Sequence, residues 1–142
     1  MKPELVRLSR AAYPYFRTVP ARFGDMDEEG HLNNVALAGF YEEARVSFLR
    51  HYLKSKDGQE FRFVIANMNI TYLAEAHYPG DYDVGVGVSR IGNSSFNLGA
   101  GLFLGETCLG VMDTVQVVIA NDKPSSIPQH LRDALARHTL VE

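Results

Sequence analysis

The chain has 142 residues, which is the length of one ordinary domain. Its 14 lysines and arginines stand against 17 aspartates and glutamates, a net charge of −3, so there is no basic excess to bind a nucleic-acid backbone. Hydrophobic residues make up 46% of the sequence, enough to build a buried core. We therefore expect one folded domain over residues 1–142 that does not bind nucleic acid.

Cysteine content and the longest apolar stretch bear on the cellular compartment. The single cysteine, Cys108, excludes an intramolecular disulfide and a thiolate metal cage. The first ten residues lack an apolar stretch of signal-peptide length. The stretch from Val115 to Ala120 is far shorter than the roughly 20 residues that a membrane span requires. These features predict a cytoplasmic protein without membrane contact.

The first half of the chain predicts a strand, a loop and one long helix. After a proline-broken lead-in, the alternation of polar and apolar residues over 15–23 predicts a strand, in which Pro20 favours an edge position. The polar loop GDMDEEGHLNN follows, and apolar residues then recur at helical spacing over 34–54. Because they cover more than half of the helix circumference, we expect this helix to be buried on most sides.

The second half predicts four long strands and a short closing helix. The strand-like segments are 61–74, 82–91, 95–105 and 107–120, and residues 128–138 predict the helix. A sheet of about five strands with one apolar helix indicates an α+β fold in which a curved antiparallel sheet wraps the helix. Four mid-strand glycines fit strong sheet curvature or a close approach of the helix backbone: Gly85, Gly87, Gly99 and Gly101.

The polar loop before the helix holds a dense cluster of chemically capable side chains: Asp25, Asp27, Glu28, Glu29, His31, Asn33 and Asn34. A helix N-terminus presents unpaired N–H groups and partial positive charge, which suit it to stabilise a developing oxyanion. Asn33 or Asn34 can cap the helix. A carboxylate upstream can act there as nucleophile or general base, although capping and turn chemistry alone accounts for the same residues.

Metal and nucleotide motifs fit the sequence poorly. Four loop residues match the first half of an EF-hand calcium loop, but Ala36 stands where a bidentate glutamate is required. His31 and His51 are separated by most of the helix, which is not zinc-ligand spacing. The segment GVGVSR lacks the third glycine of the dinucleotide fingerprint. We expect neither a metal nor a cofactor.

Residues 22–45, RFGDMDEEGHLNNVALAGFYEEAR, resemble the signature of hotdog-fold acyl thioesterases of the 4-hydroxybenzoyl-CoA thioesterase type. Residues 69–98 and 122–135 are similar to the same family, so the resemblance spans nearly the whole chain. It implies a curved antiparallel sheet wrapped round one long helix, hydrolysis of an acyl-CoA or acyl-ACP to a free acid and a thiol, and an active site formed between two subunits.

The resemblance also assigns roles to individual residues. Asp27 matches the catalytic aspartate, which acts as nucleophile or general base, and the backbone N–H near Asn34 matches the group that polarises the thioester carbonyl. His31 matches a residue that lines the site and, in the plant acyl-ACP thioesterases, is counted in catalysis. The candidates for substrate contact are Asn33, Glu43, Ser94 and Ser95.

Several alternatives stay open at this level. Neutral Asn93 and Ser94 stand where some relatives carry a cation that meets coenzyme A phosphate, so both coenzyme A and an acyl carrier protein are candidates for the thiol carrier. A hotdog 3-hydroxyacyl dehydratase and a non-catalytic acyl-thioester-binding module share the fold. We expect a homodimer or a tetramer of dimers, because a curled sheet otherwise leaves an edge strand unpaired.

Overall fold

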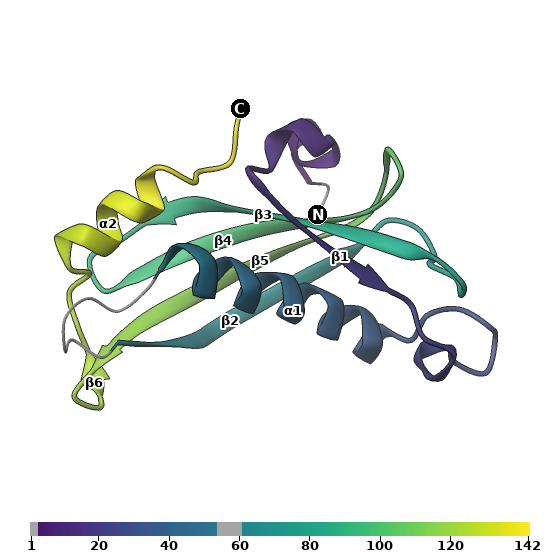
Figure 1. The fold of residues 1–142 in the computed structure, drawn as a ribbon, viewed down its shortest axis with the longest axis horizontal. Helices are drawn as coiled ribbons and strands as arrows, with labels where there is room; N and C mark the ends of the chain where they lie inside the picture. Colours follow the sequence, from purple (N-terminus) through teal and green to yellow (C-terminus); the bar gives the residue numbers. More distant parts are fainter. Residues whose placement is uncertain (1–2, 54–60) are drawn as a thin grey trace.

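A curved antiparallel sheet with a long helix across one face forms the body of the protein (Figure 1). The structure is a computed structural model that describes residues 3–53 and 61–142. In chain order its elements are η1 (Leu5–Leu8), η2 (Arg10–Ala12), β1 (Tyr15–Pro20), η3 (Phe23–Asp25), α1 (Asn34–Tyr52), β2 (Arg62–Tyr72), β3 (Asp81–Ile91), β4 (Ser95–Leu104), β5 (Thr107–Ala120), β6 (Lys123–Pro124) and α2 (Gln129–Ala136). The predicted α+β arrangement is confirmed.

The strands lie in the order β1-β3-β4-β5-β2, with β6 attached to β5. Each of these neighbouring pairs is antiparallel, and β3, β4 and β5 follow one another through tight turns. The edges of the sheet are therefore β1 and β2. Pro20 ends edge strand β1, as its missing backbone donor predicted. The first strand is shorter than expected, because residues 23–25 turn into the 3₁₀ helix η3.

Helix α1 begins where Asn33 caps it: the Asn33 side chain accepts a hydrogen bond from the Val35 N–H at 2.7 Å. Its buried side chains face the sheet and are Leu37, Phe40, Tyr41, Ala44, Arg45, Phe48 and Leu49. The expectation that α1 is buried on most sides is wrong for the single chain. The sheet covers one side, whereas Val35 is 79% exposed and Glu43 is also exposed.

The mid-strand glycines make room for the N-terminal segment and the C-terminal tail, so the expected close approach of the helix backbone is wrong. A Cβ on Gly85 would lie 2.6 Å from the Tyr13 ring, and one on Gly87 would lie 2.7 Å from the Leu140 side chain. Both distances are shorter than real Cβ contacts. Tyr13 and Leu140 belong to a hydrophobic cluster separate from the core that the α1 side chains join, so they lie against the face of the sheet opposite α1.

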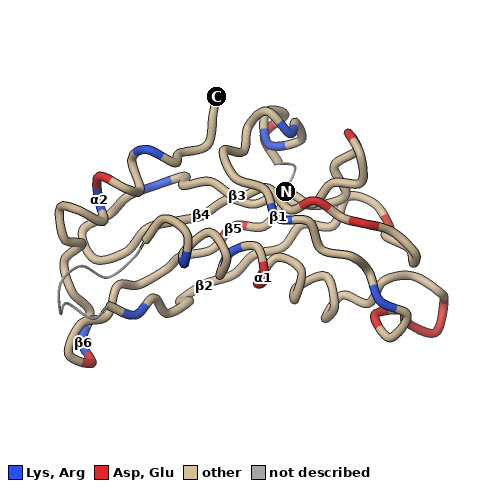
Figure 2. Tube along the Cα trace, in the orientation of Figure 1, with Lys and Arg blue, Asp and Glu red and all other residues tan. Residues whose placement is uncertain are grey.

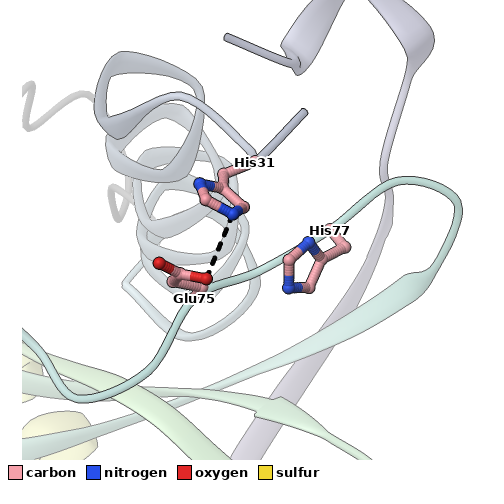
Figure 3. Close-up of side chains that lie close together, drawn as sticks. All are labelled: His31, Glu75 and His77. Atoms are coloured by element: carbon pink, nitrogen blue, oxygen red, sulfur yellow. Dashed lines mark ion pairs between the residues drawn. The ribbon is translucent and has the colours of Figure 1, made fainter. Parts of the chain in front are cut away.

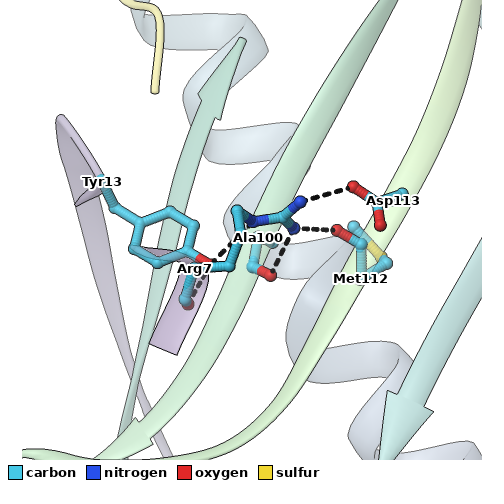
Figure 4. A network of polar contacts seen from close by, with 5 residues as sticks. All are labelled: Arg7, Tyr13, Ala100, Met112 and Asp113. Carbon is cyan, nitrogen blue, oxygen red and sulfur yellow. Dashed lines mark hydrogen bonds and ion pairs between the residues drawn. The ribbon is translucent and has the colours of Figure 1, made fainter. Parts of the chain in front are cut away.

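Arg7 fastens this N-terminal segment to the sheet (Figure 4). Its guanidinium donates to the Asp113 carboxylate at 2.9 Å and to the Met112 carbonyl at 3.1 Å. The Tyr13 hydroxyl donates to the Arg7 carbonyl at 2.7 Å and accepts from Arg7 Nε at 3.2 Å. We call Arg7, Tyr13 and Asp113 the N-terminal clamp.

In the described ranges, 3–53 and 61–142, no helix has the length and apolar character to cross a membrane.

Candidate functional site

The loop before α1 is a tight turn closed by its own backbone. The Asp27 N–H donates to the His31 carbonyl at 2.7 Å, and the Gly30 N–H donates to the Asp27 carbonyl at 3.2 Å. Gly30 has φ +84°, a left-handed conformation that glycine adopts without the steric penalty of a Cβ. The turn therefore fixes Asp27 and His31 opposite each other, directly before the helix.

Hydrogen bonds to the loop backbone orient the Asp27 carboxylate. Its Oδ1 atom accepts from the Glu29 N–H at 2.9 Å and from the His31 N–H at 3.1 Å. Within residues 3–53 and 61–142, Oδ2 takes part in no hydrogen bond. Asp27 is exposed, so one carboxylate oxygen is anchored and the other is accessible to a ligand.

Asp25 has a structural part in the same loop. It is buried, and its carboxylate accepts from the Arg22 N–H at 2.8 Å and from the Arg22 guanidinium at 3.1 Å. Burial alone raises the pKa of Asp25, but the contacts with Arg22 outweigh it and hold that pKa below its ordinary value. The Asp25 carbonyl also accepts from the Asn33 N–H at 2.7 Å. Asp25 thus joins η3 to the start of α1.

The three residues predicted to be catalytic line one cavity at the N-terminus of α1. This cavity, the Asp27 pocket, has a volume of about 370 Å³ and is lined by Asp27, His31, Leu32, Asn34, Leu37 and residues 72–76. The first N–H groups of an α-helix have no intrahelical partner, and Asn34 is the first residue of α1. A carbonyl group in the pocket can therefore place its oxygen at a backbone N–H and its carbon beside the Asp27 carboxylate.

Asn33 and Glu43 lie in a different cavity from Asp27. A cleft of about 630 Å³ separates the end of β1 from the exposed side of α1, and Asn33, Glu43, Arg22 and Asp25 are among its lining residues. The Asn33 side chain is engaged as the helix cap, and Glu43 Oε2 accepts from Arg17 Nε at 3.4 Å. Within one chain the structure does not bring these two predicted substrate contacts together with Asp27.

Ser94 and Ser95 lie at the turn between β3 and β4, as expected for a hairpin. The Ser95 carbonyl accepts from the Gly92 N–H at 2.7 Å, and the Ser94 carbonyl accepts from the Val118 N–H at 2.9 Å. This turn is at the end of the sheet near α2, whereas α1 begins at the opposite end (Figure 1). Within one chain the two serines are therefore remote from the Asp27 pocket.

Two side chains that the sequence analysis did not single out, Glu75 and His77, come close to His31. Glu75 Oε2 lies 3.1 Å from His31 Nε2, and the His31 and His77 rings meet edge to face with centroids 5.0 Å apart (Figure 3). Residues 31 and 77 pair as an antiparallel bridge. No local spacing signals this proximity, because the segment after β2 supplies both side chains.

The charge on the molecule is uneven along its length. Acidic residues gather in the loop before α1, at one end of the molecule (Figure 2). Asp27, Glu28 and Glu29 are all exposed there. A polyanionic group on a ligand is disfavoured beside this loop, because like charges repel.

We predict that Gly30→Ala lowers the free energy of unfolding by about 1–2 kcal/mol, the cost of placing a Cβ in the left-handed region. Open space surrounds Gly30, so the cost reports backbone strain alone. Gly24→Ala is the matched control: it lies in the same loop in open space without a positive φ, and we expect a change within about 0.5 kcal/mol. Urea unfolding of both variants measures the difference, and equal stabilities would refute the strained turn.

The chain is similar to proteins of known sequence and structure over most of its length. A family model described as the thioesterase-like superfamily matches residues 21–135. The crystal structure of the PA5185 protein from Pseudomonas aeruginosa PAO1 is similar, with 30% identity and a TM-score of 0.83, over 94% of this chain and 97% of that one.

Two further matches are more distant in sequence. A thioesterase from Thermus thermophilus, complexed with coenzyme A and Zn, is 25% identical with a TM-score of 0.79, over 89% of this chain and 94% of that one. The uncharacterized protein YsmA of Bacillus subtilis is 28% identical over 101 residues, 71% of this chain and 67% of that protein.

Proposed function

Because the chain belongs to the thioesterase-like superfamily and has the predicted hotdog fold, we propose that it hydrolyses an acyl-CoA to a free carboxylic acid and coenzyme A. The observation that carries this proposal is the Asp27 pocket. It combines an accessible carboxylate oxygen with the N-terminus of a long helix. Thioester hydrolysis requires these two elements, a nucleophile or base and a stabiliser for the carbonyl oxygen.

The proposed reaction places the thioester carbonyl oxygen at the Asn34 N–H, where the helix N-terminus stabilises the developing negative charge. Asp27 Oδ2 then has two possible roles. It attacks the carbonyl carbon and expels the thiolate, leaving an acyl-enzyme anhydride that water cleaves, or it removes a proton from a water molecule that attacks instead. Both routes consume one water and release the acid and the thiol.

His31 has a positioning role in this proposal. Its backbone N–H holds Asp27 Oδ1 at 3.1 Å, and its ring forms part of the pocket wall next to Asp27. The ring lies between two carboxylates: Nε2 is 3.1 Å from Glu75 Oε2, and Nδ1 is 3.7 Å from Glu29 Oε2. His31 therefore contributes to the shape and the electric field of the pocket, while Asp27 carries out the bond-making step.

Two observations favour coenzyme A over an acyl carrier protein as the thiol carrier of the proposed substrate: one relative and the charge distribution. The thioesterase from Thermus thermophilus is complexed with coenzyme A. The acidic loop favours the uncharged thioester end of the substrate at the Asp27 pocket, so the phosphates of coenzyme A lie away from it. Ser94 and Ser95 remain the proposed contacts for that distal part.

The exposed edge of β2 supports a homodimer. This edge strand carries three partly exposed large hydrophobic side chains, Val64, Met68 and Tyr72. A long edge strand with apolar side chains is normally covered by another strand, and antiparallel pairing with a twin does this symmetrically. When two β2 strands pair antiparallel about a two-fold axis, the two sheets run in opposite directions. This arrangement brings the partner's β3–β4 turn to the end where α1 of the first subunit begins.

We predict a dimer in sedimentation velocity at micromolar concentration, and a shift toward monomer for Met68→Lys, because a charge at the pairing edge disfavours association. Glu106→Lys is the control, since Glu106 lies in the turn between β4 and β5 and not on the β2 edge. A wild-type chain that sediments as an active monomer would contradict the proposed assembly.

Mixed dimers test whether Ser94 and Ser95 act from the partner subunit. A chain carrying Asp27→Asn and a chain carrying Ser94→Ala with Ser95→Ala are each impaired alone. In a mixed dimer, serines acting across the interface leave one of the two sites intact, so activity returns to about half the wild-type value per dimer. Serines acting within their own chain leave both sites defective, and mixing restores nothing.

Thiol release tests the proposed function itself. The purified chain is incubated with acyl-CoAs of increasing chain length and with aryl-CoAs, and free thiol is detected with a chromogenic disulfide. We expect saturable release from at least one class of acyl group. Tight binding of acyl-CoA without release would contradict hydrolysis and favour a binding module.

A further inference from the structure

We infer that His31, Glu75 and His77 form a binding site for one Zn²⁺ ion at the mouth of the Asp27 pocket. Their ligand atoms all lie within 4.8 Å of one another, and Figure 3 shows the three side chains converging. Two imidazoles and a carboxylate form a ligand set that zinc uses in sites that keep a fourth position open for water. The inference rests on this geometry alone and holds whether or not the chain hydrolyses thioesters.

One of the distances between ligand atoms already matches what zinc requires. Tetrahedral zinc with bonds of about 2.0–2.2 Å separates its ligand atoms by roughly 3.3 Å. The Nε2 atom of His31 and the Oε2 atom of Glu75 are already 3.1 Å apart. Glu75 and His77 are exposed, so rotation of their side chains closes the remaining distance without displacing packed atoms.

The backbone that carries the ligands is held in place before any ion binds. The His31 carbonyl accepts from the Asp27 N–H at 2.7 Å, and the Leu32 N–H donates to the Ala76 carbonyl at 2.8 Å. Both backbone groups of His77 are bonded to the Tyr82 hydroxyl, at 2.9 and 2.6 Å. Tyr82 itself is buried in the core. Binding an ion therefore orders only side chains, which limits the entropic cost.

A second carboxylate, that of Glu29, lies on the side of the His31 ring away from Glu75, near the position that an outer-sphere carboxylate takes in zinc sites. His31 faces Glu75 through Nε2, and Glu29 Oε2 lies 3.7 Å from its other ring nitrogen, Nδ1. A carboxylate behind a ligating histidine fixes the ring and raises its basicity. Among the residues that the structure describes, no other three His, Cys, Asp or Glu side chains bring their ligand atoms within 4.8 Å of one another.

Zinc titration of the untagged, metal-free chain tests the site. Isothermal titration calorimetry is expected to give one Zn²⁺ per chain, and millimolar Mg²⁺ is expected not to compete, because imidazole ligands suit zinc whereas Mg²⁺ prefers oxygen ligands. His77→Ala and Glu75→Gln are each expected to weaken Zn²⁺ binding by at least about 100-fold, the upper end of what loss of an outer-sphere partner costs.

His51→Ala is the matched control, since His51 is also exposed but lies near the C-terminal end of α1. Its affinity for Zn²⁺ is expected to equal that of the wild type. Circular dichroism of each metal-free variant verifies the fold. Absence of saturable binding to the wild-type chain, or binding that survives both His77→Ala and Glu75→Gln, would overturn the site. Because binding is measured without substrate, neither result bears on the proposed hydrolysis.

Discussion

Asp27→Asn is expected to lower kcat/KM for acyl-CoA hydrolysis by about 10² to 10⁴, the usual cost of losing a positioned acid or base. The amide has almost the same size as the carboxylate and keeps an oxygen for the Glu29 and His31 N–H groups. The loop conformation is therefore preserved while the nucleophile or base is lost. Initial rates of thiol release, measured in the presence of a metal chelator, give the effect.

Glu28→Gln is the control for Asp27→Asn, because it removes an exposed carboxylate from the same loop, and we expect a change of less than about threefold. His31→Ala is expected to cost less than Asp27→Ala, since His31 positions and Asp27 reacts. Equal losses for the two alanine variants would mean that they act as one unit. A fully active Asp27→Asn variant would remove Asp27 from the mechanism.

Phe48→Ala is expected to lower the free energy of unfolding by about 3–5 kcal/mol, the range for deleting a buried phenylalanine side chain. Phe48 is 0% exposed at the centre of the core. Its ring meets those of Tyr15 and Tyr52 edge to face, with centroids 5.8 and 5.1 Å away. These neighbours are anchored on a strand and on the helix, so they cannot collapse fully into the cavity. Guanidinium unfolding monitored by circular dichroism measures the loss.

Val35→Ala provides the comparison for Phe48→Ala, because Val35 belongs to the same helix and its side chain is largely exposed. We expect a change within about 0.5 kcal/mol. Similar losses at the two positions would show that helix propensity, rather than burial against the sheet, dominates the stability of α1.

Periodicity was sufficient to locate the elements of the fold, because each strand and helix has its own local pattern. Helix α1 begins at Asn34, where the cap and the apolar spacing predict it. The burial of α1 was misjudged, since apolar residues on a helix do not reveal whether a second layer covers them. The role of Gly85 was also misjudged, because a glycine signals close approach but not which segment approaches.

The loop residues of the candidate site could be predicted because they lie close together along the chain, whereas Glu75 and His77 could not. Asp27 and His31 are neighbours along the chain, and the structure places both in one cavity with Asn34. Glu75 and His77 reach the same place only through the pairing of residue 31 with residue 77. A search that considered His31 with His51 alone could not find them, because long-range pairing leaves no spacing signal in one sequence.

The N-terminal clamp also bears on the order of events in folding. The bond from Arg7 to Asp113 joins residues 106 positions apart, and closing such a long loop costs more entropy than forming the β3–β4 and β4–β5 hairpins. We expect the clamp to close after the folding transition state, so stopped-flow measurements of Arg7→Ala should show faster unfolding and an unchanged folding rate. Slower folding with unchanged unfolding would contradict this order. If so, the N-terminal segment slows unfolding of the native state, so its main effect is on the lifetime of the folded protein and not on how fast it forms.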